Sequence, residues 1–300
     1  MMIICASRRT DIPAFFPTWF MNRIEAGYCT VVNPFNSKQI SYVSLLPGDV
    51  DVIVFWTKNA APIFKSLQKL DSRGYRYYFQ YTVNDYPVSF EPNLPVLPQR
   101  IEDFKQLSAK LEYEKVIWRY DPIIISNLTP YEYHLSKFAK IAEELRGFTK
   151  RVVISIVDEY RKATYNFRKL QKQGICLGTN YTLPEFGEMI KKMVAIACNN
   201  DMEIFSCAER IDLKGFNVLP NKCVDDKYIK KVFNLDIEKQ KDKYQRPECG
   251  CIKSKDIGFY DTCLHGCCYC YAGSYFAGSN NHKKHKPESP SLLGYYDVNL

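Results

Sequence analysis

The sequence has no run of apolar residues approaching the ~18 that a membrane-spanning helix requires. Its first apolar stretch, residues 1–6, is followed at once by Arg8 and Arg9, a pattern that does not match a secretory signal peptide. Internal repeats and the motifs of a dedicated nucleic-acid-binding domain are also missing. We therefore expect no membrane association and a cytoplasmic location.

A disulfide scaffold is excluded on similar grounds. The 12 cysteines in 300 residues are too sparse for one, and a reducing cytosol would keep them as thiols. They nevertheless exceed what core packing needs, and four of them fall within Cys263–Cys270. Such clustering in a cytosolic chain favours metal or iron–sulfur ligation.

The composition indicates a folded chain with a sizeable core, because 46% of residues are hydrophobic and 25% are charged. The net charge of +8, from 41 Lys and Arg against 33 Asp and Glu, fits either an ordinary soluble surface or a polyanionic substrate. The composition shifts near Asp236. We predict a (β/α) barrel core over residues 1–235, completed by a cysteine-rich segment over residues 236–300.

Short apolar runs alternate with segments of helical period. Strands are predicted at Ile3–Ala6, Val50–Thr57, Tyr75–Thr82, Val116–Tyr120, Val152–Val157 and Glu203–Ala208. Their near-continuous apolar character is typical of parallel strands covered on both faces. Apolar stripes at 101–111 and 135–145 predict helices, and Thr182 with Glu185 predicts the capped start of another. The alternation predicts an α/β fold, a partial (β/α) TIM-like barrel of parallel strands.

The strongest motif is the C-x3-C-x2-C spacing of Cys263, Cys267 and Cys270, with Tyr269 directly before the third cysteine. Three thiolates from one tight loop can hold three corners of a cubane [4Fe–4S] cluster, which leaves the fourth iron open to a substrate or cofactor. A zinc site is the alternative, and it would need a fourth ligand such as Cys268 or His265. A simple electron-carrying cluster is a further alternative.

This spacing, with its aromatic residue, resembles the motif of the radical SAM superfamily. There the open iron binds S-adenosylmethionine (SAM), whose one-electron cleavage gives methionine and a 5′-deoxyadenosyl radical. That motif usually lies near the N-terminus, whereas here it lies near the C-terminal end. The chain therefore resembles a circularly permuted member, in which a strand at Ile257–Tyr260 leads into the loop. It also resembles an uncharacterised family of radical-SAM-like proteins with a C-terminal cysteine cluster.

Further stretches, in permuted order, resemble the spore photoproduct lyase branch of that superfamily. They are Ser7-Arg8-Arg9-Thr10-Asp11, Thr57-Lys58-Asn59, Glu91-Pro92 with Arg100, and Arg119-Tyr120-Asp121-Pro122-Ile123-Ile124. Each lies at or just after the C-terminal end of a predicted strand. Active sites of parallel α/β barrels gather at that end.

The resemblance implies roles for individual side chains. The ammonium of Lys58 would pair with the carboxylate of SAM, and Tyr269 would lie near its adenine. Ser155, inside an apolar strand, would face the barrel interior and contact SAM, or would be a core serine. Arg119, also within an apolar strand, needs an anionic partner, which could be SAM, the substrate, Asp121 or Glu91.

The polar cluster after the first strand has two interpretations. Ser7, Thr10 and Asp11 would contribute to cofactor binding, whereas Asp11 alone also fits the N-cap of a following helix. Arg8 and Arg9 could hold an anionic substrate.

A second set of cysteines, Cys207, Cys223, Cys249 and Cys251, is numerous enough to close an auxiliary [4Fe–4S] cluster or a zinc site. Scattered free thiols are the alternative. The remaining cysteines outside the two sets are predicted to be structural, and the basic stretch Asn280–Pro290 is predicted to be a solvated tail.

We therefore expect a radical SAM enzyme that receives its electron from a flavodoxin or ferredoxin. Its 5′-deoxyadenosyl radical would abstract hydrogen from an unidentified substrate, for which an anionic or nucleic-acid-derived molecule, a peptide and a small metabolite all stay open. The alternative is a non-catalytic iron–sulfur or zinc protein with an electron-transfer or nucleic-acid-binding role.

Overall fold

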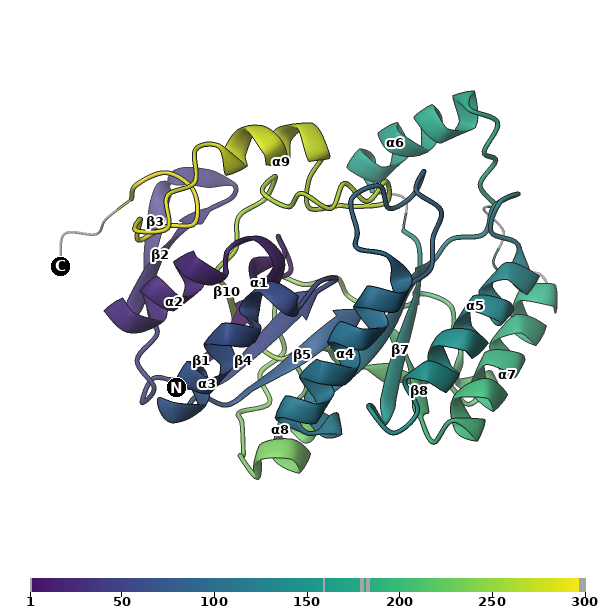
Figure 1. Ribbon diagram of the computed structural model, residues 1–300, viewed down its shortest axis with the longest axis horizontal. Coiled ribbons are helices and arrows are strands. Elements are labelled where there is room, and N and C mark those ends of the chain that lie inside the picture. Colours follow the sequence, from purple (N-terminus) through teal and green to yellow (C-terminus); the bar gives the residue numbers. More distant parts are fainter. Residues whose placement is uncertain (1, 159, 179–180, 182–183, 297–300) are drawn as a thin grey trace.

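The computed structural model describes residues 2–158, 160–178, 181 and 184–296. Its centre is a parallel sheet of eight strands in the order β10-β1-β4-β5-β6-β7-β8-β9 (Figure 1). The strands are β1 (Met2–Ala6), β4 (Val50–Thr57), β5 (Tyr77–Thr82), β6 (Val116–Ile123), β7 (Arg151–Ile156), β8 (Glu203–Cys207), β9 (Leu219–Asn221) and β10 (Lys255–Asp256). Within the described residues β9 and β10 are the two edges, so the α/β fold is confirmed and the strand pairing does not close a barrel.

The last strand in the chain lies beside the first one in space. Lys255 and Asp256 of β10 pair in parallel with Ile4 and Cys5 of β1. The strand predicted at Ile257–Tyr260 is therefore misplaced, because the chain leaves the sheet after Ile257 donates to the carbonyl of Cys5 at 3.1 Å. Gly258 then passes so close to Ser7 that a Cβ on it would lie 2.0 Å from the Ser7 hydroxyl oxygen.

One face of the sheet is covered by helices (Figure 1). These are α3 (Phe64–Ser72), α4 (Leu97–Leu111), α5 (Tyr131–Glu144) and α7 (Pro184–Asn199). The predicted stripes at 101–111 and 135–145 lie in α4 and α5 and contribute buried residues such as Phe104, Leu107 and Phe138 to the core. Thr182, predicted to cap the helix now seen as α7, lies outside the described residues.

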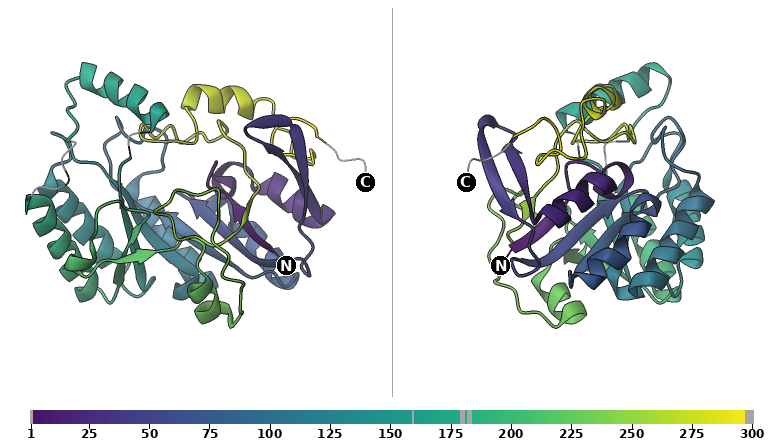
Figure 2. Two further views of the ribbon diagram at one scale, coloured as in Figure 1. Left: turned by 180° about the vertical axis from the view of Figure 1, so that it is seen from behind. Right: turned by 60° about the vertical axis from the view of Figure 1, so that its left-hand side comes forward.

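The opposite face is covered by the chain after β8 (Figure 2). Val224, Tyr228 and Ile229, from around α8 (Asp226–Phe233), and Ile252 pack there against inward-facing strand residues such as Tyr78. Cys223, Cys249 and Cys251 belong to the same apolar cluster. The stretch 223–252 thus supplies the second layer over the sheet, and only its later part belongs to the cysteine-rich segment.

A hairpin of β2 (Tyr28–Asn33) and β3 (Asn36–Ser44), which the sequence did not reveal, lies beside α2 (Pro17–Ala26).

The prediction of a solvated tail at Asn280–Pro290 is wrong in its second half. The indole of Trp19 donates to the carbonyl of Ser289 at 3.0 Å, and Asn22 donates to that of Pro287 at 2.9 Å. The chain after α9 (Tyr275–His282) is therefore held against α2.

None of the helices described is long and apolar enough to cross a membrane.

Candidate functional site

A cavity of about 460 Å³ lies at the C-terminal ends of the parallel strands. Thirteen of the fourteen residues predicted to bind a cofactor or metal line it: Thr10, Asp11, Lys58, Arg119, Ser155, Cys207, Cys223, Cys249, Cys251, Cys263, Cys267, Tyr269 and Cys270. These residues come from at least five strand ends and from the C-terminal segment. The parallel topology brings them together, because every strand ends on the same side of the sheet.

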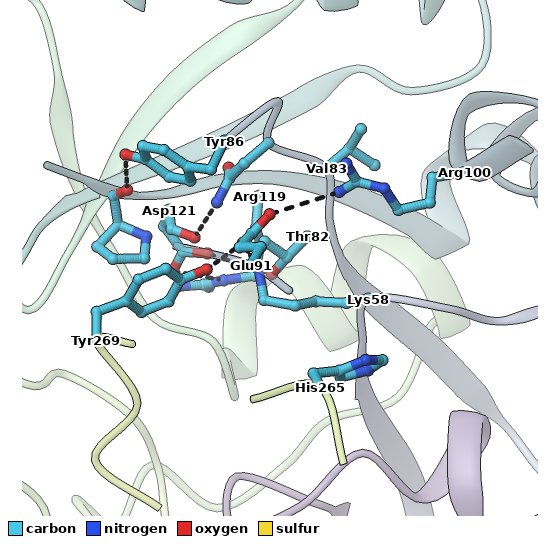
Figure 3. A network of polar contacts seen from close by, with 12 residues as sticks. Lys58, Thr82, Val83, Tyr86, Glu91, Arg100, Arg119, Asp121, His265 and Tyr269 are labelled. Atoms are coloured by element: carbon cyan, nitrogen blue, oxygen red, sulfur yellow. Dashed lines mark hydrogen bonds and ion pairs between the residues drawn. The ribbon is translucent and has the colours of Figure 1, made fainter. Parts of the chain in front are cut away.

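Glu91 is the centre of a buried polar network on one wall (Figure 3). Its Oε1 accepts a hydrogen bond from the ammonium of Lys58 at 2.9 Å and another from the hydroxyl of Tyr269. Arg100 approaches its Oε2 at 3.9 Å. Burial opposes both charges, but Glu91 and then Cys267 raise the pKa of Lys58, and Lys58 and Arg100 lower the pKa of Glu91. Lys58 is therefore an ammonium ion whose partner is already present.

Asp11 links three segments of the site. Its Oδ1 accepts the backbone N–H of Ala14 at 3.0 Å, which confirms it as the N-cap of α1 (Ile12–Phe15). Its Oδ2 accepts the N–H of Lys58 and the Nε2–H of His265, both at 2.8 Å. The capping carboxylate thus also fixes the end of β4 and the cysteine loop.

Ser7 and Thr10 occupy different surroundings. Ser7 is the one predicted residue that does not line the cavity, and its hydroxyl donates to the carboxylate of Asp256 at 2.6 Å. That bond ties the ends of β1 and β10 together. The hydroxyl of Thr10 is buried, with no hydrogen-bond partner in the described part of the chain. Thr10 itself is one of the residues that line the cavity.

Arg119 finds its anionic partner two residues away, in Asp121 rather than Glu91. Its Nε donates to Asp121 Oδ2 at 3.0 Å, and its Nη1 donates to Gln80 at 3.2 Å and to the sulfur of Cys223 at 3.0 Å. Ser155 Oγ lies 3.5 Å from the same Asp121 oxygen. The guanidinium therefore joins the sheet to the second set of cysteines.

The loop after β10 places three thiols on the cavity wall. Cys263, Cys267 and Cys270 line the cavity, whereas Cys268 does not. The N–H of Cys268 donates to the Phe90 carbonyl at 2.9 Å, and both residues belong to an apolar cluster that also includes Cys267. Burial raises the pKa of Cys267 to about 12, although the neighbouring Lys58 opposes this shift. A thiol so placed becomes a thiolate when a metal displaces its proton.

The second set of cysteines lies on another part of the same wall. The sulfurs of Cys207 and Cys223 are 3.2 Å apart. The thiol of Cys223 also interacts with that of Cys251, which in turn interacts with Cys249. The four thiols form a continuous chain, but no three His, Cys, Asp or Glu side chains among the described residues already surround one point as metal ligands would.

The cavity wall also carries guanidinium groups next to aromatic rings. The Arg8 guanidinium lies 5.2 Å from the ring centre of Trp56, and that of Arg9 lies 5.3 Å from the ring centre of Tyr260. Arg246 pairs with Asp158 and lies 5.9 Å from the ring of Tyr160. Cationic groups on the wall favour a polar, negatively charged ligand.

Sequence reasoning missed the central position of Glu91 and the structural roles of His265 and Asp256. Glu91 stands in one of the stretches that carried the family resemblance, so its motif was visible while its partners were not. His265 lies between two cysteines of the loop and had been considered only as a zinc ligand. No local pattern signals the partners of these three side chains, which are 33, 254 and 249 positions distant.

The fold and the site define an α/β protein with a thiol-lined cavity at the C-terminal edge of a parallel sheet. The chain belongs to the family described as Domain of unknown function (DUF1848), whose model matches residues 3–272. No curated protein sequence matches it.

Solved structures similar to the chain include the D-hydantoinase of Bacillus sp. AR9, with 14% identity and a TM-score of 0.29 over 57% of this chain and 39% of that one. The dihydropyrimidinase of Brevibacillus agri NCHU1002 has 15% identity and a TM-score of 0.26, over 54% and 34%. The chain thus spans about two fifths of the hydantoinase at most. Likenesses this weak carry no argument about fold or function.

Proposed function

We propose that the chain is a circularly permuted radical SAM enzyme. The observation that carries the proposal is the placement of Cys263, Cys267 and Cys270 on one loop, where all three line the cavity at the strand ends and Cys268 does not. Three cavity-facing thiols suit a [4Fe–4S] cluster with one open iron.

The strand order supports the permutation. β10, which precedes the cysteine loop, lies at the edge of the sheet beside β1, and β1, β4, β5, β6, β7 and β8 then follow in chain order. A chain opened between β10 and β1 would give this arrangement, with the loop-bearing strand first in space and last in sequence. The Ser7–Asp256 bond lies at that junction.

The donor set fits an iron–sulfur cluster with one open iron. A structural zinc needs a fourth ligand. Cys268 does not line the cavity, whereas His265 does: its Nε2–H is donated to Asp11 and its Nδ1 has no hydrogen-bond partner among the described residues, so His265 is the candidate fourth ligand of the zinc alternative. The three loop thiols are the soft ligands that iron–sulfur clusters use.

When bound, the cluster and SAM would supply the one-electron cleavage of the sulfonium to methionine and a 5′-deoxyadenosyl radical. Lys58 has three donor hydrogens, of which Glu91 takes one, so the others can bind a carboxylate. Tyr269 is held by Glu91, which fixes its ring at the cavity wall. Arg119 and Ser155 line the same cavity and would supply further polar contacts.

The substrate would bind in the same cavity, whose wall carries several guanidinium groups. Arg8 and Arg9 favour an anionic molecule, of which nucleic-acid-derived compounds are one class. A flavodoxin or ferredoxin would supply the electron. For this chemistry the cavity walls would have to exclude water and hold the target carbon next to the bound cofactor.

The test compares two neighbouring cysteines after anaerobic reconstitution with iron and sulfide. Cys268→Ala should keep the cluster and the change in its electron paramagnetic resonance spectrum on SAM addition, whereas Cys267→Ala should lose both. A cluster lost in Cys268→Ala and kept in Cys267→Ala would support the alternative, a closed non-catalytic site. Zinc retained in place of iron would also overturn the proposal.

A further inference from the structure

Four of the eight cysteines outside the loop come from three separate segments of the chain. Cys207 ends β8, Cys223 follows β9, and Cys249 and Cys251 precede β10. Their thiols form the continuous chain described above, and all four line the cavity. Side chains gathered from such separate segments indicate a site formed by the folded chain.

The surroundings of these thiols carry donors and positive charge. Arg119 Nη1 donates to Cys223 Sγ at 3.0 Å, and the backbone N–H of Val224 donates to Cys251 Sγ at 3.5 Å. The positive charge of Arg8 also interacts electrostatically with the side chains of Cys251 and Cys223. N–H groups directed at sulfur and nearby cations stabilise thiolates and anionic clusters.

The spacing argues against zinc. Structural zinc sites take their cysteines from short knuckles of the C-x2–4-C type. Here Cys249 and Cys251 are separated by one residue, and the others are isolated in sequence. The thiols also face the main cavity, whereas a structural zinc is enclosed by its knuckles.

We propose that Cys207, Cys223, Cys249 and Cys251 ligate a second iron–sulfur cluster, of the [4Fe–4S] type, on the wall of the same cavity. Each thiol exchanges its proton for an iron, and the chain of contacts between the four thiols opens to surround the cluster. A closed cluster there would exchange electrons with a ligand in the cavity or with an external carrier. This site does not depend on the function proposed for the Cys263–Cys270 loop.

The decisive protein is the triple variant Cys263→Ala/Cys267→Ala/Cys270→Ala, which leaves the four cysteines untouched. After anaerobic reconstitution it should hold about four irons and about four sulfides per chain, with the spectrum of a [4Fe–4S] cluster. The wild type should hold about twice as much iron and sulfide per chain. A triple variant without iron, with zinc instead, or with a Cys207–Cys223 disulfide found by mass spectrometry would overturn the proposal.

Two further variants complete the test. Cys249→Ala/Cys251→Ala should lose about half of the wild-type iron, whereas the matched control Cys176→Ala/Cys198→Ala, which removes two exposed thiols, should lose none. If Cys249→Ala/Cys251→Ala fails to fold, Cys207→Ser replaces it. This variant should shift the reduction potential and the electron paramagnetic resonance spectrum of the second cluster. If iron is lost only in the triple variant, the second cluster is refuted and the function proposed for the loop stands. If iron is lost only in Cys249→Ala/Cys251→Ala, the second cluster stands and the function proposed for the loop is refuted.

Discussion

The imidazole of His265 donates a hydrogen bond of 2.8 Å to Asp11, 254 positions away in the sequence. This bond connects the middle of the C-x3-C-x2-C loop to the N-cap of α1 just after the first strand. Both side chains are buried, with exposed fractions of 3% and 6%. The loop is thus fixed to the opposite end of the chain by one shared carboxylate.

Replacing Asp11 by Ala should therefore cost more stability than losing a helix cap. It removes the cap, about 1 kcal/mol, and two further bonds to a charged acceptor, so we expect a loss of about 3 kcal/mol or more. Urea unfolding measures it. Ser274→Ala, which removes only the cap of α9, is the matched control and should cost about 1 kcal/mol. Equal losses in the two variants would contradict the linking role of Asp11.

Gly278 of α9 supports the loop from outside. A Cβ at this position would lie 2.3 Å from the carbonyl oxygen of Cys263, so backbone would have to move. Gly278→Ala should cost about 1–3 kcal/mol and reduce iron retained by the loop. Gly215→Ala is the control, because nothing lies within 4 Å of a Cβ there. Unchanged stability and iron content in Gly278→Ala would show that the loop tolerates displacement.

Lys58 should contribute directly to SAM affinity. Loss of its ammonium in Lys58→Ala should weaken binding about tenfold or more, the effect of one charged hydrogen bond. Isothermal titration of the reconstituted protein measures this affinity. Lys69→Ala removes a lysine whose ion pair with Glu25 is half exposed, and it should bind SAM as the wild type does. An unchanged affinity in Lys58→Ala would refute the role assigned to Lys58.

His134 gives the fold a defined pH dependence. Burial lowers its pKa from 6.5 to about 4, and the neutral ring accepts from Tyr120 and donates to the carbonyl of Ile124 at 2.9 Å. Between these values the unfolded chain binds more protons, so stability falls as the pH drops from about 6.5 to about 4, by roughly 3 kcal/mol.

His134→Gln should remove this part of the pH dependence. Urea unfolding of both proteins at about pH 7 and about pH 4 gives the change in the free energy of unfolding between the two pH values, which should be smaller in the variant. A wild-type loss no larger than that of the variant would show that His134 is protonated in the folded chain.

The sheet was predictable because its strands are apolar runs. The predicted strands from Ile3–Ala6 to Glu203–Ala208 appear with boundaries that shift by at most a few residues. β10 was misplaced because it has only two residues and its pairing depends on Asp256 binding Ser7, which no local pattern encodes. The hairpin was missed because most of β3 is polar and exposed.

The set of residues that line the cavity was also largely predictable from the sequence. Residues after parallel strand ends share one edge of a sheet, and that rule, applied to the stretches that carry the family resemblance, placed Thr10, Lys58 and Arg119 together. The partners of these residues were not predictable, since they depend on side-chain packing. Glu91 binds Lys58 and Asp121 binds Arg119, although both carboxylates were possible partners for Arg119.

The central claim is that the loop thiols support cleavage of SAM. The most direct test is the formation of 5′-deoxyadenosine, measured by liquid chromatography after anaerobic reconstitution and addition of SAM and dithionite. The account predicts 5′-deoxyadenosine from the wild type and none from Cys267→Ala. A wild type with a full iron load and a reducible cluster that forms none would contradict it.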